Sequence, residues 1–126
     1  MAVMLDTSVA IHLRDGDPDI LTRIQSVRDV ITLPMVTLAE LEAGVRGEIA
    51  GIRRAQLDIL LDTFEVVPFL AEDARIYGEI VAAAGFSRRK VLDRMIAAQA
   101  IRAKASLATI NAGDFRDIPG LTLLEW

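Results

Sequence analysis

Four acidic side chains stand at positions where acidic residues are unusual. Asp6 directly follows an apolar run, and Asp114 comes shortly after a second apolar run that ends at Thr109. Glu40 and Asp93 have mostly apolar neighbours inside segments with helical patterning. Carboxylates that gather in one place repel one another unless a cation joins them. Mg²⁺ and Mn²⁺ prefer oxygen ligands of this kind, so the acids predict a metal site if the fold brings them together.

Each acid also has a structural interpretation. Thr37 and Glu40 have the spacing of a capping box, in which Glu40 would accept a hydrogen bond from the Thr37 backbone. Asp93 has a place near the positive end of a helix dipole. Asp6 and Asp114 are suited to capping a helix or forming a turn. From the residues alone, both interpretations stand.

The elements that must position these acids alternate between strand and helix. We expect strands over 2–5, 30–33, 64–69, 107–109 and 121–124, and helices over 9–13, 18–28, 37–47, 52–63, 74–84 and 89–104. This alternation is typical of an α/β fold with a mostly parallel sheet of five strands flanked by helices, in three layers. In such a sheet the carboxyl ends of the strands line the ligand crevice. We expect one domain over residues 1–126.

Composition narrows the classes of function. The formal net charge is −4, so nucleic-acid binding would need a local basic patch or metal ions. The chain has no cysteine, which excludes disulfides and thiolate chemistry. No apolar stretch approaches the ~20 residues that a bilayer needs, and Asp6 interrupts the only candidate signal sequence. We therefore expect a cytoplasmic protein.

Four stretches together resemble the PIN-domain family, specifically the VapC-type ribonuclease toxins. They occur in the family's order and extend over nearly the whole chain: Leu5-Asp6-Thr7-Ser8-Val9, Ala39-Glu40-Leu41 with Gly44, Asp93 with Ile96-Ala97-Ala98, and Thr109-x-Asn111-x-x-Asp114-Phe115. The resemblance implies a PIN-like fold and an endoribonuclease that depends on Mg²⁺ or Mn²⁺. It further implies an RNA substrate, a homodimer and inhibition by a cognate antitoxin, as the toxin of a toxin–antitoxin pair.

The resemblance also assigns roles to individual residues. It implies a catalytic site of four acids: Asp6, Glu40, Asp93 and Asp114. Of these, Asp6, Asp93 and Asp114 are the expected metal ligands. The expected orienting groups, which hold the acids or the substrate, are Thr7, Ser8, Thr109 and Asn111.

A basic stretch precedes and follows Asp93. It consists of Arg88, Arg89, Lys90 and Arg94, and we expect these residues to contact the RNA backbone. The alternative is a solvated start of a helix, although basic residues at a helix N-terminus oppose its dipole. Ile110 departs from the family pattern, in which a basic residue is frequent at this position.

Three other interpretations compete with a metal-dependent nuclease. Ser8 and His12 have i, i+4 spacing, but no G-x-S-x-G motif accompanies them, so we expect His12 to be a surface residue. A receiver-like or other Mg²⁺-dependent phosphoryl-transfer protein would need adjacent acids on the first strand and a lysine on a late strand, and Lys104 does not match that lysine. In a non-catalytic interaction domain, all four acids would serve only as caps.

Overall fold

Five parallel strands form the centre of the molecule. The computed structural model describes residues 2–126. The strands pair in the order β3-β2-β1-β4-β5, and every neighbouring pair is parallel. Their bounds are β1 (Val3–Leu5), β2 (Ile31–Pro34), β3 (Glu65–Val67), β4 (Ser106–Thr109) and β5 (Thr122–Glu125).

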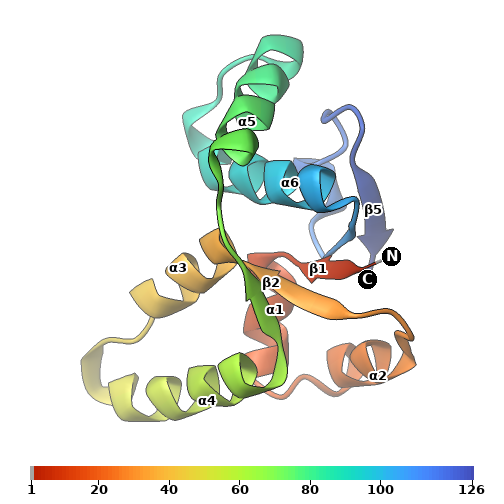
Figure 1. Cartoon of the computed structure of the whole chain (residues 1–126). Coiled ribbons are helices and arrows are strands. Elements are labelled where there is room, and N and C mark those ends of the chain that lie inside the picture. The colour runs from red at the N-terminus through yellow and green to blue at the C-terminus, as the bar shows by residue number, and fades with distance from the viewer. Residues whose placement is uncertain (1) are drawn as a thin grey trace.

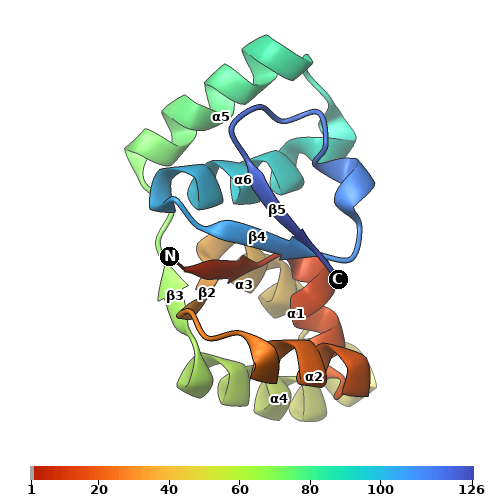
Figure 2. The same ribbon diagram turned by 90° about the vertical axis from the view of Figure 1, so that its right-hand side faces the viewer.

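Helices cover both faces of this sheet. The α-helices are α1 (Thr7–Arg14), α2 (Pro18–Ser26), α3 (Met35–Ala43), α4 (Ala50–Thr63), α5 (Ala71–Ala84) and α6 (Val91–Ala103). Short 3-10 helices lie at η1 (Gly47–Ile49), η2 (Arg88–Lys90) and η3 (Ala112–Asp114). Figures 1 and 2 show α5 and α6 on one side of the sheet and α2 and α4 on the other. The expected three-layer α/β fold is confirmed.

The strand sequences explain the two covering layers. Side chains alternate between the faces of a strand, so both faces must be apolar when helices cover both. Met4 and Leu107 join the core beneath α5 and α6, whereas Val3, Leu5 and Ala108 join the core shared with α1 and α4. All five of these side chains are at most 5% exposed.

Local signals set several helix ends. Asp17 accepts hydrogen bonds from the backbone amides of Asp19 and Ile20 and so caps α2, with Pro18 at the first helical position. α5 ends at Gly85, whose φ of 85° favours glycine.

Several predicted helix boundaries differ from those of the structure, and two of these differences bear on the candidate acids. The helix expected to begin at Thr37 begins at Met35, directly after Pro34. The helix expected over 89–104 is divided, because η2 precedes α6. In both places the helical backbone starts from a preceding extended residue rather than from the residue that the side-chain pattern suggested.

The parallel arrangement places the carboxyl ends of the strands on one edge of the sheet. Figure 2 shows β1 and β4 pointing in the same direction, with α1 beginning where β1 ends. Residues that follow β1 and β4 are therefore neighbours in space, although about a hundred positions separate them in the sequence. None of the helices within residues 2–126 has the length and apolar character of a membrane-spanning segment.

Candidate active site at the carboxyl edge of the sheet

Asp6 lies at the centre of this edge, between β1 and α1. It is 3% exposed, and its carboxylate accepts three hydrogen bonds. Oδ1 accepts from the Ser8 hydroxyl at 2.6 Å and from the Val9 amide at 2.9 Å, while Oδ2 accepts from the Thr109 hydroxyl at 2.6 Å. Asp6 therefore does cap α1, as the structural interpretation suggested, but it is also held in place by two side chains that the capping role does not need.

Thr109 connects the end of β4 to this carboxylate. Its side chain is fully buried, and its hydroxyl donates to Asp6 and accepts from the Asn111 amide at 2.9 Å. One hydroxyl therefore fixes both the Asp6 carboxylate and the backbone turn that leads into η3.

Glu40 reaches the same edge from α3. Its Oε1 accepts a hydrogen bond from the Thr7 hydroxyl at 2.7 Å. The capping-box interpretation is wrong, because Pro34 is the N-cap of α3 and no side chain caps that end. The Thr37 hydroxyl donates instead to the carbonyl of Leu5 at 3.2 Å. Glu40 is therefore free of a structural task within its own helix.

The pKa of Asp93 responds to the charges of the three other acids. The residue is half-buried in the first turn of α6. Desolvation, and then the negative charges of Asp114, Glu40 and Asp6, together raise the pKa of its carboxyl to about 6, against a smaller opposing effect of Lys90. A carboxyl group with its pKa near neutrality beside other acids is typical of a functional site.

Asp114 completes the group from η3. It is half-buried and lines a wide, open hollow together with Asn111 and Gly113, with a volume of about 260 Å³. The Asn111 side chain is exposed at the rim of this hollow. The four predicted acids therefore come from four separate segments of the chain to one open edge.

The donor set fits a hard divalent cation. Within residues 2–126, no three Asp, Glu or His side chains lie close enough together to form a metal-binding group in this geometry. The negative charges of Asp114, Glu40 and Asp6 nevertheless act on the Asp93 carboxyl, and a cation would relieve this repulsion. The acids and the hydroxyls that hold them offer oxygen, the ligand that Mg²⁺ and Mn²⁺ prefer.

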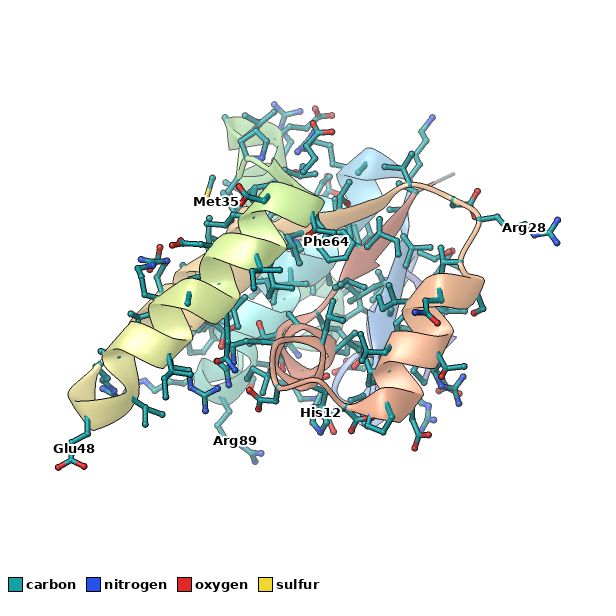
Figure 3. The ribbon with its side chains drawn as sticks, turned by 90° about the horizontal axis from the view of Figure 1, so that it is seen from below. His12, Arg28, Met35, Glu48, Phe64 and Arg89 are labelled. Carbon is teal, nitrogen blue, oxygen red and sulfur yellow. The ribbon has the colours of Figure 1, made fainter. Side chains whose placement is uncertain are left out.

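The basic residues divide into two kinds. Arg88 and Arg89 are exposed on η2, and Figure 3 shows Arg89 pointing away from the body of the protein. Arg94 is only 2% exposed, since its guanidinium donates to the carbonyl of Gly85 and to Asp117. The structure therefore contradicts the expectation that Arg94 contacts RNA, because Arg94 ties two loops together. A buried arginine cannot be recognised from the charge pattern alone.

Lys90 and His12 have structural partners of their own. Lys90 is half-buried and lies 3.6 Å from Asp117. His12 is exposed, as expected, and its Nδ1 lies 2.8 Å from the backbone carbonyl of Ser8. The Ser8 hydroxyl donates to Asp6 instead, so Ser8 and His12 do not form a nucleophile–base pair.

Sequence reasoning missed the role of Thr37. This side chain is fully buried, and its hydroxyl lies 3.4 Å from that of Thr7, which holds Glu40. Thr37 therefore ties α3 to the end of β1 beneath the site. The sequence did contain a signal, because a hydroxyl residue stands one turn before an acid in an otherwise apolar helix. We interpreted that spacing as a capping box instead.

Comparisons with known proteins agree with this geometry. The PIN domain family matches residues 3–121. A protein named Ribonuclease VapC from Rickettsia bellii is 31% identical over 130 residues, covering 98% of this chain and 96% of the relative. Ribonuclease VapC2 from Rickettsia felis is 29% identical over 134 residues, covering 100% and 98%.

A solved structure is similar over its full length. The crystal structure of VapBC2 from Rickettsia felis, bound to a DNA fragment from its promoter, contains a chain that superposes with a TM-score of 0.88 at 29% identity. The match covers 100% of this chain and 99% of that one. Because the family match spans almost the whole sequence and the fold agrees, this chain belongs to the PIN-domain family.

Proposed function

We propose that this protein is a divalent-metal-dependent endoribonuclease and the toxin of a toxin–antitoxin pair. The observation that carries the proposal is the convergence of Asp6, Glu40, Asp93 and Asp114 on the open carboxyl edge of the sheet. Two of them, Asp6 and Glu40, are oriented by hydroxyl groups from other segments. Acids that served only as caps would not need such partners.

The relatives support the choice of substrate and partner. Two proteins that match this chain almost end to end are named ribonucleases, and a similar solved structure is a VapBC assembly. On this basis the proposed substrate is RNA and the proposed partner is a cognate antitoxin. The homodimer and the cytoplasmic location that the sequence led us to expect are part of the same proposal.

Three of the acids are the proposed metal ligands. Asp6, Asp93 and Asp114 would hold Mg²⁺ or Mn²⁺, with Glu40 at the side of the site nearest α3. When bound, such a cation lowers the pKa of a coordinated water and neutralises charge on the phosphoryl group.

The remaining residues position the reacting groups. Thr109 and Ser8 hold the Asp6 carboxylate, and Thr7 holds that of Glu40, so both acids keep their orientation when substrate binds. The exposed amide of Asn111 is available to donate to a phosphate oxygen. The exposed guanidinium groups of Arg88 and Arg89 lie on the segment just before Asp93, where they would attract the RNA backbone.

Substitution of two acids tests this proposal. Asp6→Asn and Asp93→Asn should each reduce Mg²⁺-dependent RNA cleavage by at least ~10³-fold, since several kcal/mol of charge stabilisation are lost. Both variants should also bind Mn²⁺ more weakly by calorimetry at pH 7. Asp62→Asn, an exposed acid on α4, is the matched control and should leave both quantities unchanged.

Two results would contradict the proposal. One is full cleavage by both purified, folded variants. The other is a wild-type protein that neither binds Mn²⁺ nor cleaves any RNA offered to it, because the acidic edge would then have no catalytic use.

A further inference from the structure

We propose that a pocket beside the acidic site holds one base of the RNA, next to the phosphodiester that is cleaved, and that it prefers guanine. The inference rests on the proposed function, since it names a subsite of the same reaction. The pocket has a volume of about 240 Å³. That is near the lower end of small-molecule sites, roughly 300–1,000 Å³, and suits a single base rather than a longer ligand.

The pocket lies where α1 and α2 meet the ends of β4 and β5. Its apolar lining comes from Ile20, Ile110 and Trp126, and its polar lining from His12, Asp17, Asp19 and Arg23. Figure 3 shows His12 at the surface near the junction of α1 and α2. Proteins bind unstacked bases against apolar and aromatic side chains with polar groups around them, and this pocket combines an indole ring with such groups.

A short chain of hydrogen bonds joins this pocket to the acidic site. The Ser8 hydroxyl, which donates to Asp6, also accepts from the Ile110 amide at 3.4 Å, and the Ser8 carbonyl bonds His12. On the β5 side, the Trp126 amide donates to the Thr109 carbonyl at 2.9 Å. Ser8 and Thr109, which both hold Asp6, therefore also form hydrogen bonds with three residues that line the pocket.

The segment after β4 separates the two sites. Ile110 lines the pocket, whereas Asn111 and Asp114 line the hollow at the acids. An RNA strand that crosses this segment can place a phosphate at the acids and the adjoining base against Ile110. Ile110 is 36% exposed and gives the chain an apolar surface at that point.

The charges of the pocket favour a base over a phosphate group. Asp17 and Asp19 place two carboxylates around it, against the single guanidinium of Arg23. A phosphate would be repelled by this balance, whereas a neutral base with N–H donors would be attracted.

The hydrogen-bonding groups indicate which base fits. Asp17 uses Oδ1 to cap α2, whereas the exposed carboxylate of Asp19 has no hydrogen-bond partner among residues 2–126. Two carboxylate oxygens match the adjacent N1–H and N2–H donors of guanine, a pattern that uracil does not offer. Arg23 and Trp126 supply the planar groups on which the base would stack.

The fluorescence of Trp126, the only tryptophan in the chain, provides the test. The full-length protein in EDTA is titrated with guanosine, adenosine, cytidine or uridine, with correction for nucleoside absorption. We expect saturable quenching, tightest for guanosine and weakest for uridine. Asp19→Asn and Arg23→Ala should each weaken guanosine binding about fivefold or more, the lower range for loss of one base contact.

Matched controls separate this pocket from general surface effects. Asp62→Asn and Arg28→Ala alter exposed residues outside the pocket and should leave quenching unchanged; Figure 3 shows Arg28 pointing away from the protein. Ribose 5-phosphate should not quench. In RNA cleavage, Asp19→Asn should raise KM for substrates with guanine beside the cleaved bond and leave kcat unchanged.

The outcomes distinguish this inference from the proposed function. A protein that cleaves RNA but shows no nucleoside quenching, or quenching by ribose 5-phosphate or by uridine as strong as by guanosine, overturns the pocket proposal alone. Nucleoside binding without metal-dependent cleavage supports the pocket and overturns the nuclease assignment.

Discussion

Two carboxylates on the packed pair α5 and α6 have opposite surroundings. Asp73 in the first turn of α5 is fully buried, caps the helix by accepting from the Leu70 amide at 2.8 Å, and pairs with Arg102 of α6. Asp93, in the first turn of α6, is half-buried among three other acids, and the pKa of its carboxyl is raised to about 6.

The difference identifies which acid serves the fold. A buried charge is tolerated when a cation and hydrogen bonds compensate for its desolvation, as they do for Asp73. Among residues 2–126, Asp93 has no such compensation apart from the weaker influence of Lys90. Its position therefore costs stability and is explained by the cation that we propose for the site.

The largest expected effect is a loss of stability when the buried carboxylate of Asp73 is removed. Asp73→Ala should lower the free energy of unfolding by about 3–5 kcal/mol, because it leaves the partly buried Arg102 without its partner. Urea denaturation measures this change. Glu72→Ala, at the exposed neighbouring position, is the control and should change stability by less than about 0.5 kcal/mol. A loss below about 1 kcal/mol for Asp73→Ala would show that the pair behaves like an exposed one.

The next effect concerns the hydroxyl that holds Asp6. Thr109→Val should reduce kcat/KM for RNA by about 10–100-fold, as for other groups that orient metal ligands. Thr32→Val is the matched control in β2, since its hydroxyl is buried without a hydrogen-bond partner among residues 2–126. That variant should keep full activity and equal or slightly higher stability. Equal activity of the two variants would show that Thr109 does not orient the acid.

The third expected effect is a gain of stability when the charge of Asp93 is removed. In EDTA at pH 7, Asp93→Asn should raise the free energy of unfolding by about 1–2 kcal/mol, a value reduced from the full pKa shift because the group is partly exposed.

The sign of the pH dependence follows from the pKa shift. The carboxyl of Asp93 has a pKa of about 6 in the folded protein and 3.8 as its ordinary value, so the folded state retains a proton that the unfolded state has released. Stability of the wild type relative to Asp93→Asn should therefore fall as pH rises from about 4 to 6, and then stay constant. Urea denaturation of both proteins measures this difference. An equal difference in the free energy of unfolding between wild type and Asp93→Asn at about pH 4 and at about pH 6 would contradict the proposed repulsion at Asp93.

The smallest effect is at the basic rim. Arg89→Ala should weaken RNA binding a fewfold and reduce the slope of log affinity against log salt by about 1, in filter-binding assays with Ca²⁺ in place of Mg²⁺. Arg28→Ala, also exposed, should change neither. An unchanged salt slope for Arg89→Ala would remove it from the RNA surface.

Much of the fold was predictable because its signals are local. Apolar runs that alternate with helical patterns predicted the parallel sheet, and Asp17-Pro18 predicted the start of α2, because both depend on neighbouring residues. The start of α3 was misplaced because Thr37 and Glu40 have the spacing of a cap. Pro34 begins that helix earlier, so Thr37 lies within it rather than at its end.

The four acids were predicted as a set, but their hydrogen-bond partners were not. Strand ends and family resemblance indicated Asp6, Glu40, Asp93 and Asp114. The charge pattern could not show that Arg94 is buried against Gly85 and Asp117, since these partners lie 9 and 23 positions away and only the fold brings them to it.

The sequence by itself determined which acids the chain carries and at which ends of its strands and helices they stand. Only the tertiary structure decided what each acid does. Thr7 holds Glu40 across 33 positions, and Thr109 holds Asp6 across 103. Hydrogen bonds and charge interactions depend on distance in space, which the parallel sheet sets by bringing the ends of β1 and β4 together. That is why Asp73 serves the fold while Asp93 is left uncompensated.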